Sequence, residues 1–78
     1  RLHYLMKVTV EYNWLGKVEN EVRQSTYILE DISYTEDVDI FIYVPIEDED
    51  DFTLWMNEIT NGQAKISSMT TKFLEFNI

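Results

Sequence analysis

Residues 38–62 decide the fold, and they read VDIFIYVPIEDEDDFTLWMNEITNG. From Val38 to Val44 hydrophobic residues recur at every second position, which predicts a strand with one face buried. Pro45 has no N–H for a strand ladder, so we expect the strand to end there. From Phe52 to Ile59 the hydrophobic spacing is that of an amphipathic helix, and Asn61-Gly62 is typical of a helix C-terminus.

The flanking sequence supplies four more elements. Residues 3–12 alternate in the same way and predict a strand, with Tyr12 as the last residue of its hydrophobic face. Residues 14–25 predict a short amphipathic helix with Asn13 as its N-cap. β-Branched and aromatic residues predict strands over residues 27–34 and from residue 65 to about residue 76.

The predicted order is strand, helix, strand, strand, helix, strand. Such a split βαβ pair folds as a four-stranded antiparallel sheet with both helices on one face, the ferredoxin-like arrangement of the α+β class. We therefore expect one ferredoxin-like domain over residues 1–78. The chain begins at Arg1 rather than Met, which suggests a domain of a longer protein.

Charge is the strongest compositional signal. The 78 residues contain 15 Asp and Glu, six Lys and Arg and one His, for a formal net charge of −9. Eleven of the acidic residues and no Lys or Arg fall within residues 24–64, so both ends of the chain are nearly neutral. A chain this acidic repels nucleic acid and anionic membranes unless its few cations share one surface.

Several classes of protein are disfavoured by what the sequence lacks. It has no cysteine, which removes disulfides and thiolate metal sites. No hydrophobic run approaches the roughly 18 residues of a membrane span, and no signal peptide is recognisable. A cytoplasmic location without membrane contact is therefore the default expectation.

The acidic run Glu47–Asp51 suggests a calcium or magnesium site, because such cations prefer clustered carboxylates. An EF-hand frame starting at Glu47 fails, since Phe52 stands where the loop requires glycine. Carboxylates in the first turn of a helix are stabilised by its dipole, and we prefer that explanation. We expect no metal and no cofactor.

Asn13–Lys17 combines a capping residue, Gly16 and a lysine at a helix start, where an anion can bind. The turn has no arginine, as an acylphosphatase would need, so we prefer a cap followed by a glycine that lets helix and sheet approach closely. His3 is the only histidine, and Glu30 and Asp31 should alternate between the faces of their strand. We therefore predict no catalytic residues and no enzyme activity.

The sheet face opposite the helices, which we call the open face, is the remaining candidate site. It should carry Leu5, Lys7 and Thr9 from the first strand and Asp39, Phe41 and Tyr43 from the third. We expect another domain or subunit to cover it. The predicted contacts of this interaction are Leu5, Phe41, Tyr43, Lys7 and Lys17. The alternative is weak RNA or ribosome binding through Arg1, Lys7, Lys17, Arg23, Lys65 and Lys72.

Short segments in a fixed order also resemble a known family. They are Tyr12–Glu19, Tyr34 with Asp37-Val38, Val44-Pro45 and Thr60–Ala64, and they resemble the C-terminal ferredoxin-like, DUF1949-type domain of the YigZ/IMPACT family. The resemblance extends over roughly residues 4 to 66.

The resemblance implies a two-domain protein, with an upstream domain similar to the second domain of ribosomal protein S5 and this domain at its C-terminal end. It implies a fold similar to a domain of elongation factor G and a link to translation regulation under stress. It carries no catalytic residue to this chain. We expect a non-catalytic interaction module that contacts its own upstream domain or a separate protein partner.

Overall fold

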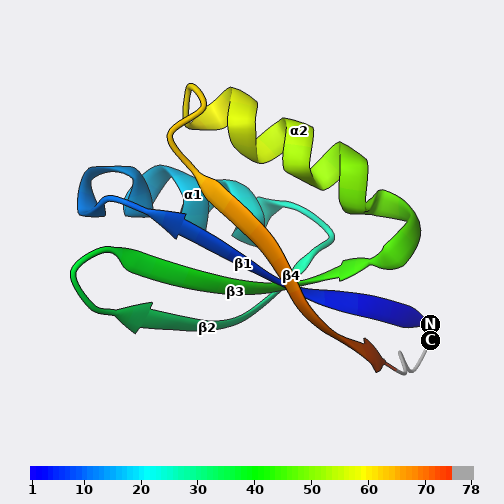
Figure 1. Cartoon of the computed structure of the whole chain (residues 1–78). Helices are drawn as coiled ribbons and strands as arrows, with labels where there is room; N and C mark the ends of the chain where they lie inside the picture. Colours follow the sequence, from blue (N-terminus) through cyan, green and yellow to red (C-terminus); the bar gives the residue numbers. More distant parts are fainter. Residues whose placement is uncertain (75–78) are drawn as a thin grey trace.

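The computed structural model describes residues 1–74 (Figure 1). Its elements follow the predicted order, with a short 3-10 helix added before the second α-helix. In chain order they are β1 (Leu2–Val10), α1 (Tyr12–Gln24), β2 (Ile28–Tyr34), β3 (Val38–Pro45), η1 (Ile46–Asp48), α2 (Glu49–Ile59) and β4 (Lys65–Phe73).

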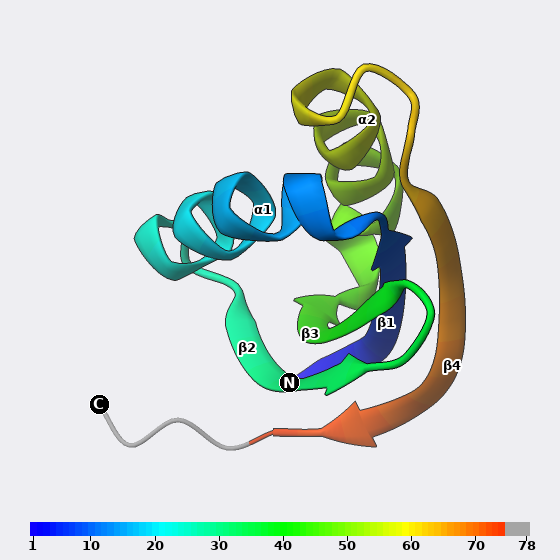
Figure 2. The same ribbon diagram turned by 90° about the vertical axis from the view of Figure 1, so that its left-hand side faces the viewer.

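The four strands form one sheet in the order β2-β3-β1-β4, and each neighbouring pair is antiparallel. Both α1 and α2 cover the same face of this sheet (Figures 1 and 2). This topology confirms the predicted ferredoxin-like fold. It leaves β1 and β3 in the centre of the sheet and β2 and β4 at its two edges.

The core lies between the sheet and the two helices. The predicted inner face of β3 is completely buried, as alternation along Val38–Val44 required. Each large aliphatic side chain buried in this way stabilises the fold by about 1.5–3 kcal/mol. The buried hydrophobic cluster consists of Met6, Val8, Val10, Val18, Val22, Val38, Ile40, Ile42, Val44, Phe52 and Met56.

Helix α1 begins earlier than the sequence predicted. Tyr12 is its first residue rather than the end of a strand, and Asn13 lies inside the first turn. Glu11 is the N-cap, in extended conformation and with no side-chain cap bond, while its carbonyl accepts the Trp14 N–H over 3.0 Å. The predicted role of Gly16 is also wrong, because a Cβ placed there would meet nothing within 4 Å.

Helix α2 ends as predicted. Asn61 and Gly62 have positive φ angles of 53° and 76°, and the Gly62 N–H donates to the Asn57 carbonyl over 2.8 Å. This pattern terminates a helix and satisfies its last carbonyls. The buried Thr60 hydroxyl completes the end by donating to the Met56 carbonyl over 2.7 Å and accepting the Ala64 N–H over 3.1 Å.

The strands differ from the prediction at their ends and in their regularity. Pro45 is the last residue of β3, opposite His3, rather than the residue after it. The end of the predicted last strand, residues 75 and 76, lies outside the described residues. Both edge strands are bulged, because Glu30 of β2 and Met69 of β4 have no partner in the register.

Candidate interaction face

The two central strands, β1 and β3, form the middle of the open face. In the β1–β3 ladder, Leu5 lies opposite Tyr43 and Lys7 lies opposite Phe41. Directly opposite residues of antiparallel strands project from the same face and contact one another. These residues alternate with the buried core positions, so the structure places all four on the face without helices.

The edge strands widen the open face on both sides. Ile28 of β2 lies opposite Tyr43, and Thr70 of β4 lies opposite Leu5. Each row therefore crosses all four strands. From β2 to β4 the rows are Ile28–Tyr43–Leu5–Thr70, Asp31–Phe41–Lys7–Ser67 and Ser33–Asp39–Thr9–Lys65.

Hydrophobic residues occupy the middle of the open face. Leu5, Ile28 and Phe41 are partly exposed, whereas Tyr43 is only 8 % exposed. The Lys72 ammonium lies 5.8 Å from the centre of the Tyr43 ring, a distance at which a cation is attracted to an aromatic face. The centre of the face is thus an apolar strip that its own neighbours only partly cover.

The charges of the open face are divided between its two halves. Lys7, Lys65 and Lys72 lie on β1 and β4, and we call them the lysine half. Asp31 and Asp39 lie on β2 and β3, and we call them the aspartate half. Asp39 also accepts a hydrogen bond of 2.6 Å from the Thr9 hydroxyl.

The other three predicted basic residues lie elsewhere. Lys17 is on α1 in the helical layer, 5.9 Å from the centre of the Trp14 ring, so it does not join the predicted contacts on the open face. Arg23 is paired with Glu19 over 2.9 Å on the same helix. Arg1 is paired with Glu47, which belongs to η1. The six cations of the alternative prediction therefore do not form one surface.

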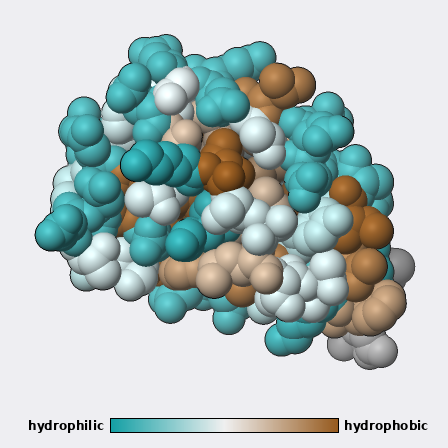
Figure 3. All heavy atoms as spheres, viewed as in Figure 1, coloured by the Kyte–Doolittle hydropathy of each residue, from teal (hydrophilic) through white to brown (hydrophobic). Residues whose placement is uncertain are grey.

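Exposed hydrophobic side chains do not mark a competing site. The large ones include Tyr12 of α1, Leu54 of α2, and Met69 and Phe73 of β4. On the side of the molecule seen in Figure 3, hydrophobic residues form separate patches among hydrophilic ones. The case for the open face therefore depends on its apolar strip and its divided charge.

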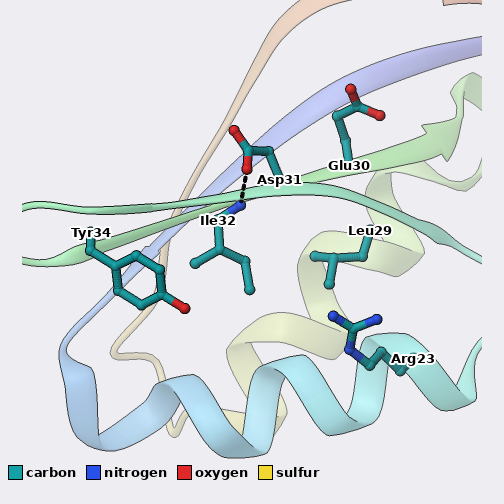
Figure 4. A pocket seen from close by; sticks show the side chains of 6 residues that line it. All are labelled: Arg23, Leu29, Glu30, Asp31, Ile32 and Tyr34. Atoms are coloured by element: carbon teal, nitrogen blue, oxygen red, sulfur yellow. Dashed lines mark hydrogen bonds between the residues drawn. The ribbon is translucent and has the colours of Figure 1, made fainter.

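A groove of about 320 Å³ runs between β2 and α1. Leu29, Ile32 and the Arg23 guanidinium border it, while Glu30 and Asp31 both point away from α1 (Figure 4). The two acids do not alternate between faces as predicted, because the bulge at Glu30 interrupts the alternation. No nucleophile and base meet among the residues that line this groove.

The acidic run lies in η1 and the first turn of α2, where carboxylates face the helix dipole. Hydrogen bonding to Arg1 lowers the pKa of Glu47.

Burial raises the pKa of the Tyr27 phenol, and the charges of Asp48 and Asp51 raise this pKa further. Within residues 1–74, no three His, Asp or Glu side chains gather closely enough to hold a metal ion.

Comparison with known families identifies this arrangement. The profile described as "Domain of unknown function (DUF1949)" matches residues 8–63, most of the chain. The chain belongs to the DUF1949 family. This DUF1949 domain is also 39 % identical over 75 residues to IMPACT family member YvyE of Bacillus subtilis (strain 168). Both findings confirm the resemblance to the YigZ/IMPACT family that the sequence segments indicated.

The DUF1949 domain corresponds to part of its relative. The match with YvyE covers 96 % of the chain but 35 % of YvyE, so the chain spans about a third of the relative's length. A solved structure described as "Crystal structure of an hypothetical protein" is similar in fold, with a TM-score of 0.73 at 15 % identity. That match covers 87 % of the chain and 33 % of the solved chain.

Two findings complete the description of the domain. Among its described helices, none is long and apolar enough to cross a membrane. Sequence reasoning assigned no residue of the second predicted strand to the open face, where Ile28 and Asp31 lie, and it did not foresee the bulge at Glu30 that shifts the register of β2. The signal was present, since two acidic residues in succession break the alternation between Leu29 and Ile32.

Proposed function

We propose that this DUF1949 domain is a non-catalytic interaction module of an IMPACT/YigZ-like protein, and that its open face contacts another protein surface. The observation that carries the proposal is the apolar strip on a sheet face without helices, in which Leu5 and Phe41 are partly exposed beside the nearly buried Tyr43. An apolar centre with charges around it is the usual anatomy of a protein interface. A cytoplasmic role linked to translation regulation belongs to the same proposal and is supported by the family alone.

The surface that covers the open face belongs either to the rest of the full-length protein or to a separate partner. The relative YvyE supports the first possibility, because about two thirds of its length lies outside the matched region. Interfaces between domains of one chain bury polar and apolar surface together. The composition of the open face suits such an interface, with Phe41 and Leu5 as apolar anchors and Lys7 as a polar contact.

The test is the affinity of this chain for the rest of its full-length protein, measured by calorimetry with wild type, Phe41→Ala and Tyr43→Ala. Truncation of an aromatic anchor at the centre of an interface should weaken binding about tenfold or more. Circular dichroism accompanies each variant, because Tyr43 is nearly buried and its loss also affects packing.

Leu54→Ala is the matched control. Leu54 is 61 % exposed on α2, in the layer opposite the open face, so its truncation should leave the affinity unchanged. The proposal is contradicted if folded Phe41→Ala and Tyr43→Ala proteins bind the rest of the protein, and every other partner found, as strongly as wild type does.

The lysine half supports a second candidate function, weak binding of single-stranded RNA. Lys7 lies opposite Phe41 and the Lys72 ammonium lies near the Tyr43 ring, and RNA-binding sheets combine cations with such rings. Lys65 lies on the same half, opposite Thr9. The aspartate half on the same face opposes this function, because Asp31 and Asp39 repel phosphates. The dependence of binding on salt distinguishes this candidate from the first.

A further inference from the structure

We propose that the partner on the open face is a second copy of this chain, packed open face to open face about a twofold axis parallel to the strands. The inference rests on the proposed function, since it names the occupant of the same face. The observation behind it is the separation of the lysine half from the aspartate half, which makes the face complementary to itself.

The charges select this axis. The lysine half lies on β1 and β4, the aspartate half lies on β2 and β3, and the boundary between them runs along the strands. A twofold axis parallel to the strands exchanges the halves, so the lysine half of each copy lies over the aspartate half of the other. An axis across the strands would place lysines over lysines. Opposite charges across an interface fix the register and disfavour other arrangements.

The apolar strip fits the same axis. The row Asp31–Phe41–Lys7–Ser67 then meets itself in reverse, which puts Lys7 of one copy over the Phe41 ring of the other. A cation above an aromatic ring is favourable. Sheets pack face to face at about 10 Å, close enough for the strips of both copies to become buried together.

The net charge of the chain does not prevent this packing. The five consecutive carboxylates of Glu47–Asp51 lie in η1 and α2, which belong to the helical layer rather than to the open face. On the face itself, three lysines of one half stand against Asp31, Asp39 and the exposed Glu30 of the other half. Salt therefore screens the repulsion between the carboxylates of the two helical layers. It screens the closer contacts between the two open faces less strongly.

The edges of the sheet are poorer surfaces for self-association. The Asp31 carboxylate accepts the Ile32 N–H over 2.8 Å, which occupies a backbone donor of the β2 edge (Figure 4). Both edge strands are bulged, at Glu30 and at Met69, and β4 carries two lysines. Bulges, charged residues and occupied donors are the features that keep edge strands from pairing. The face therefore offers the better contact.

The first experiment is sedimentation of the 78-residue chain at concentrations up to about 1 mM. We expect a reversible monomer–dimer equilibrium, and we expect Phe41→Ala to weaken the dimer about tenfold or more. The conservative variant Phe41→Leu, which keeps the apolar volume, should weaken it less. A wild-type chain that stays monomeric over the whole range would overturn the proposal.

The second experiment exchanges charges. One variant carries Lys7→Glu and Lys65→Glu, so both halves of its face are acidic, and the other carries Asp31→Lys and Asp39→Lys, so both halves are basic. Each variant alone should be monomeric, whereas their equimolar mixture should form a heterodimer. Lys17→Glu with Arg23→Glu makes the same charge change in the helical layer and should leave the homodimer intact. Circular dichroism verifies that each protein is folded.

The outcomes separate this inference from the proposed function. A dimer that survives the face variants, or two folded variants whose mixture stays monomeric, shows that the copies do not meet through their open faces. If the chain is monomeric but Phe41→Ala still weakens its affinity for the rest of the full-length protein, the second copy is excluded and the proposed function stands. If Phe41→Ala changes neither equilibrium, both fail.

Discussion

Single residues determine where this small fold gains and loses stability, and its two glycines differ in this respect. Gly16 lies in α1, is exposed, and has open space where a Cβ would project. Gly62 follows α2 with a φ angle of +76°, in the left-handed region where a side chain is strained. Only Gly62 has a conformation that requires glycine.

Replacing Gly16 with alanine should therefore stabilise the protein by about 0.5–1 kcal/mol, because glycine inside a helix loses more chain entropy on folding. Urea unfolding followed by circular dichroism measures the change. Gly62→Ala is the matched control and should lower the free energy of unfolding, since alanine disfavours that φ angle. A destabilised Gly16→Ala protein would show that this position has a tighter environment than the structure indicates.

At the scale of elements, an ion pair joins the start of the chain to the segment before α2. Arg1 Nε donates to Glu47 Oε1 over 3.1 Å, and this hydrogen bond is the largest cause of the lowered pKa of Glu47. Both side chains are more than half exposed, so the pair is screened by salt. The ion pair joins η1 to the residue that precedes β1, and it contributes little to the stability of the fold.

Arg1→Gln should raise the pKa of Glu47 toward its ordinary value of 4.5, as followed by NMR titration of its side chain. Because the folded-state pKa is lowered, the contribution of the charged Glu47 to stability is complete above pH 4.5 and disappears as the pH falls through the lowered value. Arg23→Gln, which breaks the ion pair with Glu19, should leave the Glu47 titration unchanged. An unchanged pKa in Arg1→Gln would contradict the pairing.

The regular elements could be predicted from the sequence, and the irregular ones could not. Alternation along Val38–Val44 and the stripe from Phe52 to Ile59 determine β3 and α2, because burial on one face repeats with the period of each element. The start of α1 was predicted too late because Asn13 has the chemistry of a cap, yet Glu11 occupies that position without a side-chain bond. The predicted anchors Leu5, Phe41 and Tyr43 share one face, while Lys17 does not, since its helix lies in the other layer.

At the scale of the whole molecule, charge is organised by layer and by half of the sheet. The acidic run belongs to the helical layer, and the open face carries three lysines on one side and Glu30, Asp31 and Asp39 on the other. Sequence alone located the cations at the two ends of the chain. The register of the four strands shows in addition that three of the six Lys and Arg residues, namely Lys7, Lys65 and Lys72, lie on one face of the sheet.

If the lysine half binds single-stranded RNA, three phosphate contacts predict a slope of about −2 for the logarithm of affinity against the logarithm of salt concentration. Fluorescence anisotropy with a labelled oligonucleotide measures this slope between about 50 and 200 mM salt. Lys7→Gln with Lys72→Gln should abolish most of the salt dependence, whereas Lys17→Gln should not. Absence of binding at the lowest salt concentration removes this candidate.

The central place of β1 has a consequence for how the chain folds. The β2–β3 hairpin joins neighbouring segments and can form early, since its turn closes only a short loop. The ladder between β1 and β4 instead pairs residues from opposite ends of the described sequence, such as Leu2 with Phe73. Contacts so distant along the chain are slow to form. During synthesis, β1 therefore pairs with β3 first, and its other edge stays unpaired until β4 has been synthesised. In that interval the nascent chain is exposed to misassembly through the unpaired edge of β1.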